Sequence, residues 1–213
     1  MGESIADIRC EYVNTGLDES SLAENPFDQF QQWFAEAEKS EGEDVIAMTL
    51  ATASRRGIPS ARIVLLKGVD DGFLFFTNYN SHKGRELEEN PHAALVFWWR
   101  SQNRQVRIEG RVEQIASHES DSYFASRPHG SKISAVASPQ SQVIESRQVL
   151  QERVAEVERS LSGSDGIPRP ENWGGYRLLP EVIEFWQGRE NRLHDRLQYR
   201  REGEEWIIQR LGP

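Results

Sequence analysis

Short segments rich in β-branched and aromatic residues recur along the chain from Val45 to Leu211, each bounded by Gly, Pro, Asn or Asp. Segments of this kind predict β-strands. Turn-like sequences such as Asp70-Asp71-Gly72 between them favour hairpins and therefore antiparallel pairing. The predicted strands cover residues 45–53, 60–66, 73–77, 93–99, 105–115, 175–179, 182–187, 192–200 and 206–211.

Helices are predicted in four places. Asn25-Pro26 begins the first, because Asn is a favoured N-cap and Pro is tolerated in the first turn. The others are predicted at 81–89, 117–126 and 141–161. This order favours a mainly β fold with α additions, an antiparallel barrel with peripheral helices, over a parallel doubly wound sheet. Residues 1–25 are expected to form a flexible N-terminal arm, and residues 26–213 a single domain.

The formal net charge is −9 and it is unevenly distributed. Residues 1–50 contain twelve carboxylates against only Arg9 and Lys39, whereas the rest of the chain is close to neutral. Affinity for a phosphate backbone needs a basic surface, so this charge argues against nucleic-acid binding. Most basic residues are arginines, which suit phosphate and carboxylate recognition, although a GC-rich genome would also enrich arginine.

One cysteine, Cys10, excludes an intrachain disulfide and fits a reducing compartment. The first residues show no basic region followed by an apolar one, so no secretory signal is expected. The longest aliphatic and aromatic run, 93–99, is far shorter than the ~20 residues that span a bilayer. We therefore expect a cytoplasmic protein with no membrane segment.

Two segments place cations where an anion could bind. Arg62 and Lys67 flank an apolar strand, but they have opposite parity, so both reach one ligand only if the strand bends or ends near Lys67. Thr77 precedes Lys83 at a predicted helix start, where the dipole and exposed amides favour phosphate. Cations that solubilise strand ends, and ordinary capping by Ser81, would explain the same residues.

A second cationic group follows the alternation of a predicted strand. Arg192, His194 and Arg196 would share one face, and three such groups could bind a dianion, with His194 able to exchange a proton near neutral pH. A solvated face of an edge strand would show the same pattern. Gln105 and Arg107 also share a face, and there an interior pair would need a polar partner.

Tyr123, Arg127 and Ser131 are spaced by four residues across a break expected at Pro128. A phenol ring, a guanidinium and a hydroxyl could hold an aromatic phosphate ester, and a plain surface helix would have similar residues. Trp173 and Trp186 are more typical of core positions than of ligand contacts. The histidines lack metal-ligand spacing, and neither a nucleophile elbow nor a Gly-rich nucleotide loop is present.

Taken together, these segments resemble the pyridoxamine/pyridoxine 5′-phosphate oxidase family over roughly residues 9–213. The motifs that carry the resemblance are Arg-Ile-Val-Leu-Leu-Lys (62–67), Arg-Gln-Val-Arg-Ile-Glu-Gly (104–110), Tyr-Phe-Ala-Ser-Arg-Pro (123–128), Ser-Pro-Gln-Ser (138–141), Trp-Gly-Gly-Tyr-Arg (173–177), Glu-Phe-Trp-Gln-Gly (184–188) and Arg-Leu-His-Asp-Arg (192–196). Each motif alone is weak, but seven in order make chance similarity an inadequate explanation.

The resemblance implies an FMN-binding split β-barrel, in a homodimer that holds FMN between its subunits. The FMN-binding residues it implies are Arg62, Ile63, Val64, Leu65, Leu66, Lys67, Phe76, Thr77, His82, Lys83, Gln105, Gln140, Ser141, Trp186 and Arg196. The implied substrate-binding residues are Arg9, Tyr12, Lys67, Tyr123, Arg127, Ser131, Arg192 and His194. Arg192 and His194 are also the implied catalytic residues, and no metal is implied.

The implied activity is oxidation of pyridoxamine 5′-phosphate or pyridoxine 5′-phosphate to pyridoxal 5′-phosphate, with O2 reduced to H2O2. Two alternatives stay open: a related flavin oxidase of phenazine-type biosynthesis, and a non-catalytic protein that binds FMN or pyridoxal phosphate. Three residues depart from the family pattern, because His82 replaces an arginine, Phe76 replaces a tyrosine and Cys10 stands where arginine is frequent. The acidic stretch that follows Cys10 also differs from the more basic arm of some members.

Overall fold

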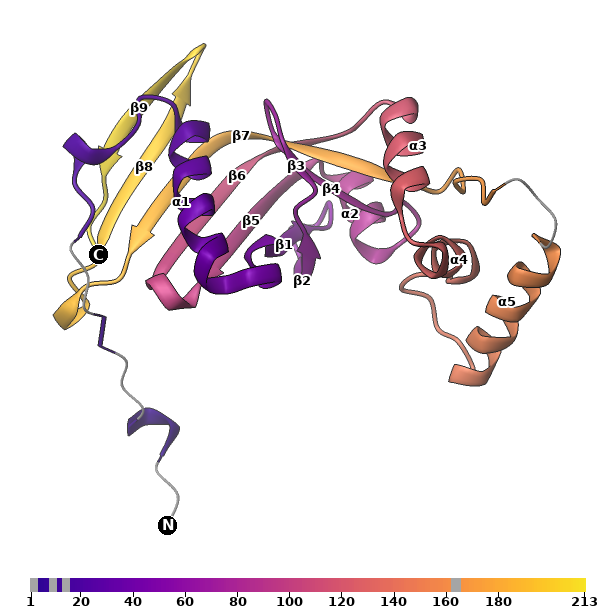
Figure 1. Cartoon of the computed structure of the whole chain (residues 1–213). Helices are drawn as coiled ribbons and strands as arrows, with labels where there is room; N and C mark the ends of the chain where they lie inside the picture. The colour runs from indigo at the N-terminus through magenta and orange to yellow at the C-terminus, as the bar shows by residue number, and fades with distance from the viewer. Residues whose placement is uncertain (1–3, 8–10, 13–15, 162–165) are drawn as a thin grey trace. The chain divides into compact units, whose positions relative to one another are not determined.

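The computed structural model describes residues 4–7, 11–12, 16–161 and 166–213. Within this part of the chain, nine strands form one large antiparallel sheet, and five α-helices and short 3-10 turns precede or connect them (Figure 1). The fold is therefore mixed α/β with the antiparallel sheet that the strand pattern predicted.

The chain divides into two compact units that are interleaved along the sequence. The first unit contains Met1–Leu50, Ala94–Gly110 and Pro180–Pro213, and the second contains Ala51–Ala93 and Arg111–Leu179. Because the boundaries fall inside strands, several strands contribute residues to both units.

The elements distribute between the units as follows. The first unit holds η1 (Ile5–Asp7), η2 (Glu19–Ser21), α1 (Pro26–Glu41), η3 (Gly42–Ile46), η4 (Arg100–Gln102), η5 (Glu190–Arg192), β8 (Asp195–Glu202) and β9 (Glu205–Arg210). The second holds β2 (Pro59–Leu65), β3 (Gly68–Val69), β4 (Phe73–Asn78), α2 (His82–Glu89), α3 (Ser117–Ser126), α4 (His129–Ala137) and α5 (Arg147–Ser160). Four strands run through both: β1 (Ala47–Ala53), β5 (His92–Trp99), β6 (Arg104–Gln114) and β7 (Trp173–Gln187).

Helix α1 begins where the sequence predicts and supplies much of the first unit's core. The Asn25 side chain accepts a hydrogen bond from the Phe27 amide at 2.9 Å, as expected of an N-cap. Phe30 and Trp33 are buried on one side of the helix. The Trp33 ring meets Phe185 edge-on with ring centroids 5.1 Å apart, so α1 is held against the end of β7 by aromatic packing.

The end of β7 also fixes the face on which two predicted site residues lie. Strand β7 pairs with β8 from Val182 opposite Arg200 to Gln187 opposite Asp195. Phe185 and Leu197 are partners in this ladder and both are fully buried. Since side chains alternate along a strand, the next pair, Trp186 and Arg196, projects to the opposite side of the sheet.

Strand β4 has the same role in the second unit. It pairs with the first half of β7, and its Phe75 is fully buried and stacks on Tyr176 at a centroid distance of 5.6 Å. The neighbouring Phe76 projects to the other face, opposite Gly175 in the register. A Cβ at Gly175 would come within 2.8 Å of the Phe76 ring, so the glycine leaves room for that ring.

Two predicted boundaries are wrong at prolines. The strands predicted at 175–179 and 182–187 are one strand, β7. Its ladder with β4 ends at Leu178 and its ladder with β8 begins at Val182, so Pro180 lies between them, where its missing N–H breaks neither ladder. Pro128 separates two helices, because α3 ends at Ser126 and Pro128 is the N-cap of α4. Helix α4 was not predicted from the sequence.

Two further boundaries are wrong because of backbone with positive φ. The helix predicted from residue 141 begins only at Arg147, since Ser141 has φ +66° and Ser146 caps the helix. The strand predicted over 192–200 begins at Asp195, because Asn191 and Arg192 have φ +55° and +61° in a tight turn. Arg192 and His194 therefore do not share a strand face with Arg196. The first predicted strand also starts later, at Ala47 instead of Val45.

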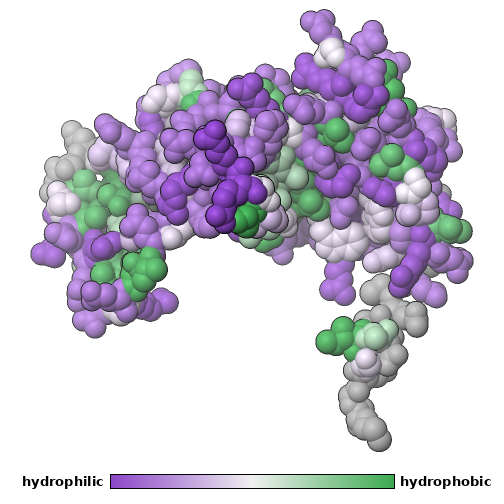
Figure 2. Space-filling view, turned by 180° about the vertical axis from the view of Figure 1, so that it is seen from behind, coloured by the Kyte–Doolittle hydropathy of each residue, from purple (hydrophilic) through white to green (hydrophobic). Residues whose placement is uncertain are grey.

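The surface carries few large apolar side chains. One face of the molecule is mainly hydrophilic, with hydrophobic residues in separate groups (Figure 2). Ile63 and Leu65, on alternate positions of β2, are 64% and 45% exposed. None of the described helices combines the length and apolar character that crossing a membrane requires.

Phe75→Ala tests whether the β4 core supports the second unit. We expect a loss of about 3–5 kcal/mol in the free energy of unfolding, because a fully buried aromatic ring leaves a cavity when truncated. Urea unfolding of both proteins measures the difference. Ile58→Ala, a truncation at a residue that is 51% exposed, is the control and should change stability by less than about 0.5 kcal/mol. Equal losses from the two variants would contradict the assignment of Phe75 to the core.

Candidate active site

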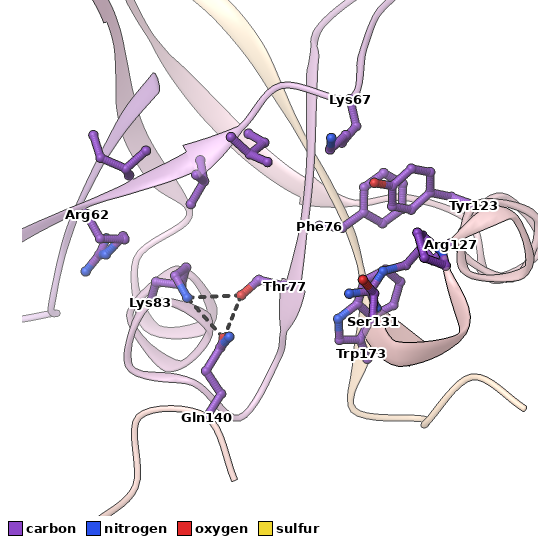
Figure 3. Close-up of a pocket in the computed structure, with 14 residues that line it drawn as sticks. Arg62, Lys67, Phe76, Thr77, Lys83, Tyr123, Arg127, Ser131, Gln140 and Trp173 are labelled. Atoms are coloured by element: carbon purple, nitrogen blue, oxygen red, sulfur yellow. Dashed lines mark hydrogen bonds between the residues drawn. The ribbon is translucent and has the colours of Figure 1, made fainter. Parts of the chain in front are cut away.

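A cavity of about 470 Å³ lies within the second unit and gathers many of the predicted site residues (Figure 3). Its walls come from β2, β4, the first turn of α2, the α3–α4 corner and the start of β7. The lining residues are Arg62, Ile63, Val64, Leu65, Lys67, Phe76, Thr77, Lys83, Tyr123, Arg127, Pro128, Ser131, Gln140 and Trp173. Four of them are cationic and none is acidic, so the cavity suits an anion.

The end of β2 explains how Arg62 and Lys67 reach the same cavity. The strand ends at Leu65, before Lys67, so the parity rule no longer applies to Lys67. The Lys67 amide donates to the Leu74 carbonyl at 2.8 Å, which holds the turn into β3 and β4. Leu66 is buried and is not among the residues that line the cavity.

One side of the cavity is built around Lys83. Ser81 caps α2 by accepting from the Gly84 amide at 3.3 Å, and this places Lys83 in the first turn with its ammonium buried. The ammonium donates to Thr77 Oγ1 at 3.0 Å and to Gln140 Oε1 at 3.1 Å (Figure 3). Thr77 in turn donates to Gln140 at 3.0 Å, so the three side chains form a closed triangle.

Burial and, less strongly, the nearby positive charge of Arg62 together lower the pKa of Lys83 to about 8. An anion bound in the cavity would favour the charged ammonium and oppose this shift. Lys83 is therefore mostly charged at neutral pH and loses its proton in mildly alkaline solution.

The other side of the cavity is a stack of aromatic rings with a guanidinium. Phe76 stacks on Tyr123 with ring centroids 3.9 Å apart and on Trp173 with centroids 5.5 Å apart. The Arg127 guanidinium carbon lies 4.6 Å from the Trp173 ring centroid, within the range of a cation–π contact. Ser131, in the first turn of α4, lines the same space (Figure 3).

Arg127 has a buried donor without a partner. Its Nη1 atom has no hydrogen-bond partner in the described part of the chain, although the atom is buried. Burial also lowers the pKa of this guanidinium and raises that of the Tyr123 hydroxyl. A buried donor left unsatisfied costs free energy, so this atom is positioned for an acceptor that the protein itself does not supply.

A further group of predicted residues lies in the first unit, where aromatic rings surround His194. The Trp186 and His194 rings have centroids 4.6 Å apart, and Tyr12 contacts both at 5.8 Å. His194 Nδ1 accepts from the Arg189 amide at 3.0 Å, which leaves the proton of the neutral ring on Nε2. Burial, and then the charge of Arg192, lower the pKa of His194. The exposed Arg192 lies in the left-handed turn before it.

A buried carboxylate holds Arg196 in this unit. Glu184 is 2% exposed and accepts from Arg196 Nε at 2.8 Å and from Arg196 Nη2 at 3.0 Å. Arg107 Nη2 donates to the same carboxylate at 2.7 Å. Glu184 is therefore the polar partner that Arg107 was expected to need on an interior face. Gln105 lies two residues earlier on β6 and is half-buried.

Several predicted residues lie elsewhere. Arg9, like Cys10, is outside the described residues. His82 is not among the lining residues, and its Nε2 is 2.9 Å from Glu86 Oε1. Ser141 follows Gln140 but is not among the lining residues.

Four residues of the two groups were not predicted as site residues from the sequence. Pro128 and Trp173 line the cavity, whereas Trp173 was favoured as a core residue; it is 6% exposed and serves both roles. Glu86 and Glu184 hold site arginines by hydrogen bonds. The signal for Glu86 was its position four residues after His82 on a predicted helix. Among the residues that the structure describes, no His, Cys, Asp and Glu cluster could hold a metal ion.

Lys83 makes anion binding dependent on pH. A group whose pKa is lowered to about 8 is charged below that pH and neutral above it. We therefore expect the dissociation constant of FMN, the cofactor implied by the resemblance, to rise between pH 7.5 and 9, by at most about tenfold. Fluorescence titration of the apo-protein measures it. Lys83→Met should bind more weakly at pH 7.5 and show a flatter profile; a profile as steep as that of the wild type would contradict the role of Lys83.

Known proteins resemble this chain over nearly its whole length. The family model for pyridoxamine 5′-phosphate oxidase matches residues 34–160, and that for the pyridoxine 5′-phosphate oxidase C-terminal dimerisation region matches residues 173–213. The chain is 57% identical over 210 residues to the pyridoxine/pyridoxamine 5′-phosphate oxidase of Thermosynechococcus vestitus, which covers 98% of this chain and 99% of that protein. Identity to the protein of the same name from Cyanothece sp. is 54% over 214 residues and 100% of both chains.

A solved structure is also similar. PhzG from Burkholderia lata 383, in complex with tetrahydrophenazine-1-carboxylic acid, aligns with a TM-score of 0.86 at 32% identity, covering 93% of this chain and 98% of that one. This chain and PhzG are therefore similar in fold as well as in sequence. With full-length relatives above 50% identity and both family models matched, the chain belongs to the pyridoxine/pyridoxamine 5′-phosphate oxidase family.

Proposed function

We propose that this protein oxidises pyridoxamine 5′-phosphate and pyridoxine 5′-phosphate to pyridoxal 5′-phosphate, with FMN as cofactor. With the amine, water and O2 are consumed, and ammonia and H2O2 are released; with the alcohol, O2 is consumed and H2O2 released. The observation that carries the proposal is a cavity whose described lining has four cations and no carboxylate, with a buried Arg127 donor that has no partner among the described residues.

The residues present fit two phosphate esters. Enzymes of this family use FMN. Arg62 and Lys83 lie on one side of Thr77 in Figure 3, and Lys67, Arg127 and Ser131 lie on the other. We assign the first group to the FMN phosphate and the second, with Tyr123, to the substrate phosphate. Every assigned side chain is a hydrogen-bond donor, as phosphate oxygens require.

We assign completion of the site to a homodimer. The cavity is lined only by residues of the second unit, whereas Gln105, Trp186, Arg192, His194 and Arg196 belong to the first. In the proposed dimer, each FMN lies between the cavity of one subunit and the Trp186 and Arg196 of the partner subunit. The match of residues 173–213 to a dimerisation region supports this arrangement. Closure of the antiparallel sheet into a split β-barrel is part of the same proposal.

Bound FMN supplies the electron-pair acceptor for the substrate and passes the electrons to O2. The protein's part is orientation and electrostatics. Arg127 and Ser131 hold the substrate by its phosphate, away from the reacting carbon, so their binding energy positions the pyridine ring. Arg192 orients the reacting side of the ring, and His194 binds beside it with its proton on Nε2.

The arm of residues 1–25 is proposed to close over the substrate. One of its described residues, Tyr12, lies against Trp186 and His194. A cytoplasmic location is proposed from the single cysteine.

The proposal is tested by reconstitution with FMN followed by addition of pyridoxamine 5′-phosphate under air. We expect flavin absorbance to copurify or be restored, and equal amounts of pyridoxal 5′-phosphate and H2O2 to form. Absence of flavin binding would remove the whole proposal. Flavin binding without product would instead identify a non-catalytic binding protein.

The similarity to PhzG makes a phenazine-type acid the second substrate to test. Such an acid offers a carboxylate in place of a phosphate ester. Arg127, Ser131 and Lys67 provide more donors than one carboxylate accepts, which favours the phosphate ester. We expect the catalytic efficiency to be higher for pyridoxamine 5′-phosphate than for a tetrahydrophenazine carboxylic acid, and the reverse order would identify the phenazine activity.

Arg192→Ala separates substrate orientation from cofactor binding. We expect the turnover number to fall by about a hundredfold or more, because misplacing the reacting ring costs about this much. The dissociation constant of FMN should change by less than about twofold, since Arg192 is assigned to the substrate. Steady-state kinetics and FMN titration of the same preparation measure both. An unchanged turnover number would refute the role of Arg192.

A further inference from the structure

Glu86 is a buried carboxylate next to the cavity that the proposed mechanism does not use. It lies on α2, one turn after Lys83, and its side chain is only 7% exposed. Burying a carboxylate is costly unless it is paired and hydrogen-bonded. The hydrogen-bond partners of Glu86 therefore indicate its role.

Glu86 is connected to the Arg62 guanidinium mainly through two hydroxyls. Thr52 Oγ1 donates to Glu86 Oε2 at 2.5 Å, and Ser60 Oγ donates to the same oxygen at 2.6 Å. Arg62 donates to both hydroxyls, from Nη1 to Thr52 at 2.5 Å and from Nη2 to Ser60. A direct contact from Arg62 Nη2 to Glu86 Oε2 is longer, at 3.4 Å. The Thr52 and Ser60 hydroxyls thus bridge the ion pair between Arg62 and Glu86.

The second carboxylate oxygen is also held. His82 Nε2 lies 2.9 Å from Glu86 Oε1, one helical turn away, with 59% of the His82 side chain exposed. Burial raises the pKa of Glu86, but the hydrogen bonds from Ser60, Thr52 and His82 outweigh it and lower the pKa to about 2. The carboxylate is therefore ionised throughout the neutral range.

Glu86 has two opposite effects on anion binding in the cavity: its charge weakens binding, and its hold on Arg62 strengthens it. A negative charge beside Arg62 repels an anion in the cavity, so on charge alone removal of Glu86 would strengthen binding. Orientation of Arg62 acts the other way, because the two hydroxyls and Glu86 hold one edge of the guanidinium. A flexible arginine would instead lose side-chain entropy when it bound the anion.

We propose that Glu86 is a positioning residue that, through Thr52 and Ser60, holds Arg62 oriented toward the phosphate of FMN. The inference rests on the proposed function, because it takes FMN as the ligand of the Arg62 side of the cavity. Glu86 itself does not contact the phosphate. The two hydroxyls transmit its effect from β1 and β2 to Arg62.

The test compares FMN with riboflavin, which lacks the phosphate, by fluorescence titration of the full-length apo-protein. Glu86→Gln keeps the shape of the side chain and removes its charge. Glu86→Asp keeps the charge and withdraws the carboxylate by about one carbon–carbon bond, ~1.5 Å. We expect each variant to weaken FMN binding by about tenfold, the scale of a lost hydrogen bond to a charged group, and to leave riboflavin binding unchanged.

Glu88→Gln is the matched control, because it removes the same charge from an exposed position of the same helix. Its FMN dissociation constant should stay within about twofold of the wild type. Melting temperatures of the apo-proteins confirm that each variant folds.

Three results would overturn the inference. Tighter FMN binding by Glu86→Gln would mean that only the charge of Glu86 acts on the site, and unchanged binding would mean that Glu86 does not position Arg62. Parallel loss of FMN and riboflavin binding would mean that Glu86 only supports the fold. Absence of FMN binding by the wild-type protein would remove the proposed function together with this inference, and the wild-type titration alone distinguishes that outcome from the other two.

Discussion

The convergence of four cations on one cavity is the constraint on which the site depends. Like charges at close range repel each other, and burial strengthens the repulsion because water is excluded. The fold offsets this in a different way for three of the four cations. Glu86 pairs with Arg62 through bridging hydroxyls, Lys83 donates to neutral oxygens, and Arg127 lies over the face of Trp173. Lys83 keeps a pKa of about 8 and therefore titrates in mildly alkaline solution.

In the first unit, two neighbouring arginines are likewise stabilised by a buried carboxylate, Glu184. Glu184 accepts from both Arg107 and Arg196, so two guanidinium groups share one negative charge. Glu86 and Glu184 thus act locally, in contrast to the carboxylates of residues 1–50 that dominate the net charge of −9. Net charge describes the surface and its partners, whereas the binding of an anion is decided by the few charges that line its cavity.

The sequence predicted those parts of the site whose residues lie close together along the chain. The spacing of Tyr123, Arg127 and Ser131 brought them to one cavity, because two short helices joined at Pro128 kept the residues close. The strand predicted through Arg192 failed, since periodicity cannot detect a left-handed turn at a residue other than glycine. Boundaries of that kind depend on contacts that the local sequence does not contain.

By itself, the sequence determined the antiparallel strands, the N-cap of α1 and the cationic segments, because each depends on residues within a few positions of one another. Only the tertiary structure decided which cations share a cavity and which carboxylates hold them. Thr52, Ser60 and Arg62 lie on two strands, and Glu86 lies on a helix more than twenty residues later. Their contact requires the sheet to be folded first, since a hydrogen bond depends on distance in space and local patterns report only distance along the chain.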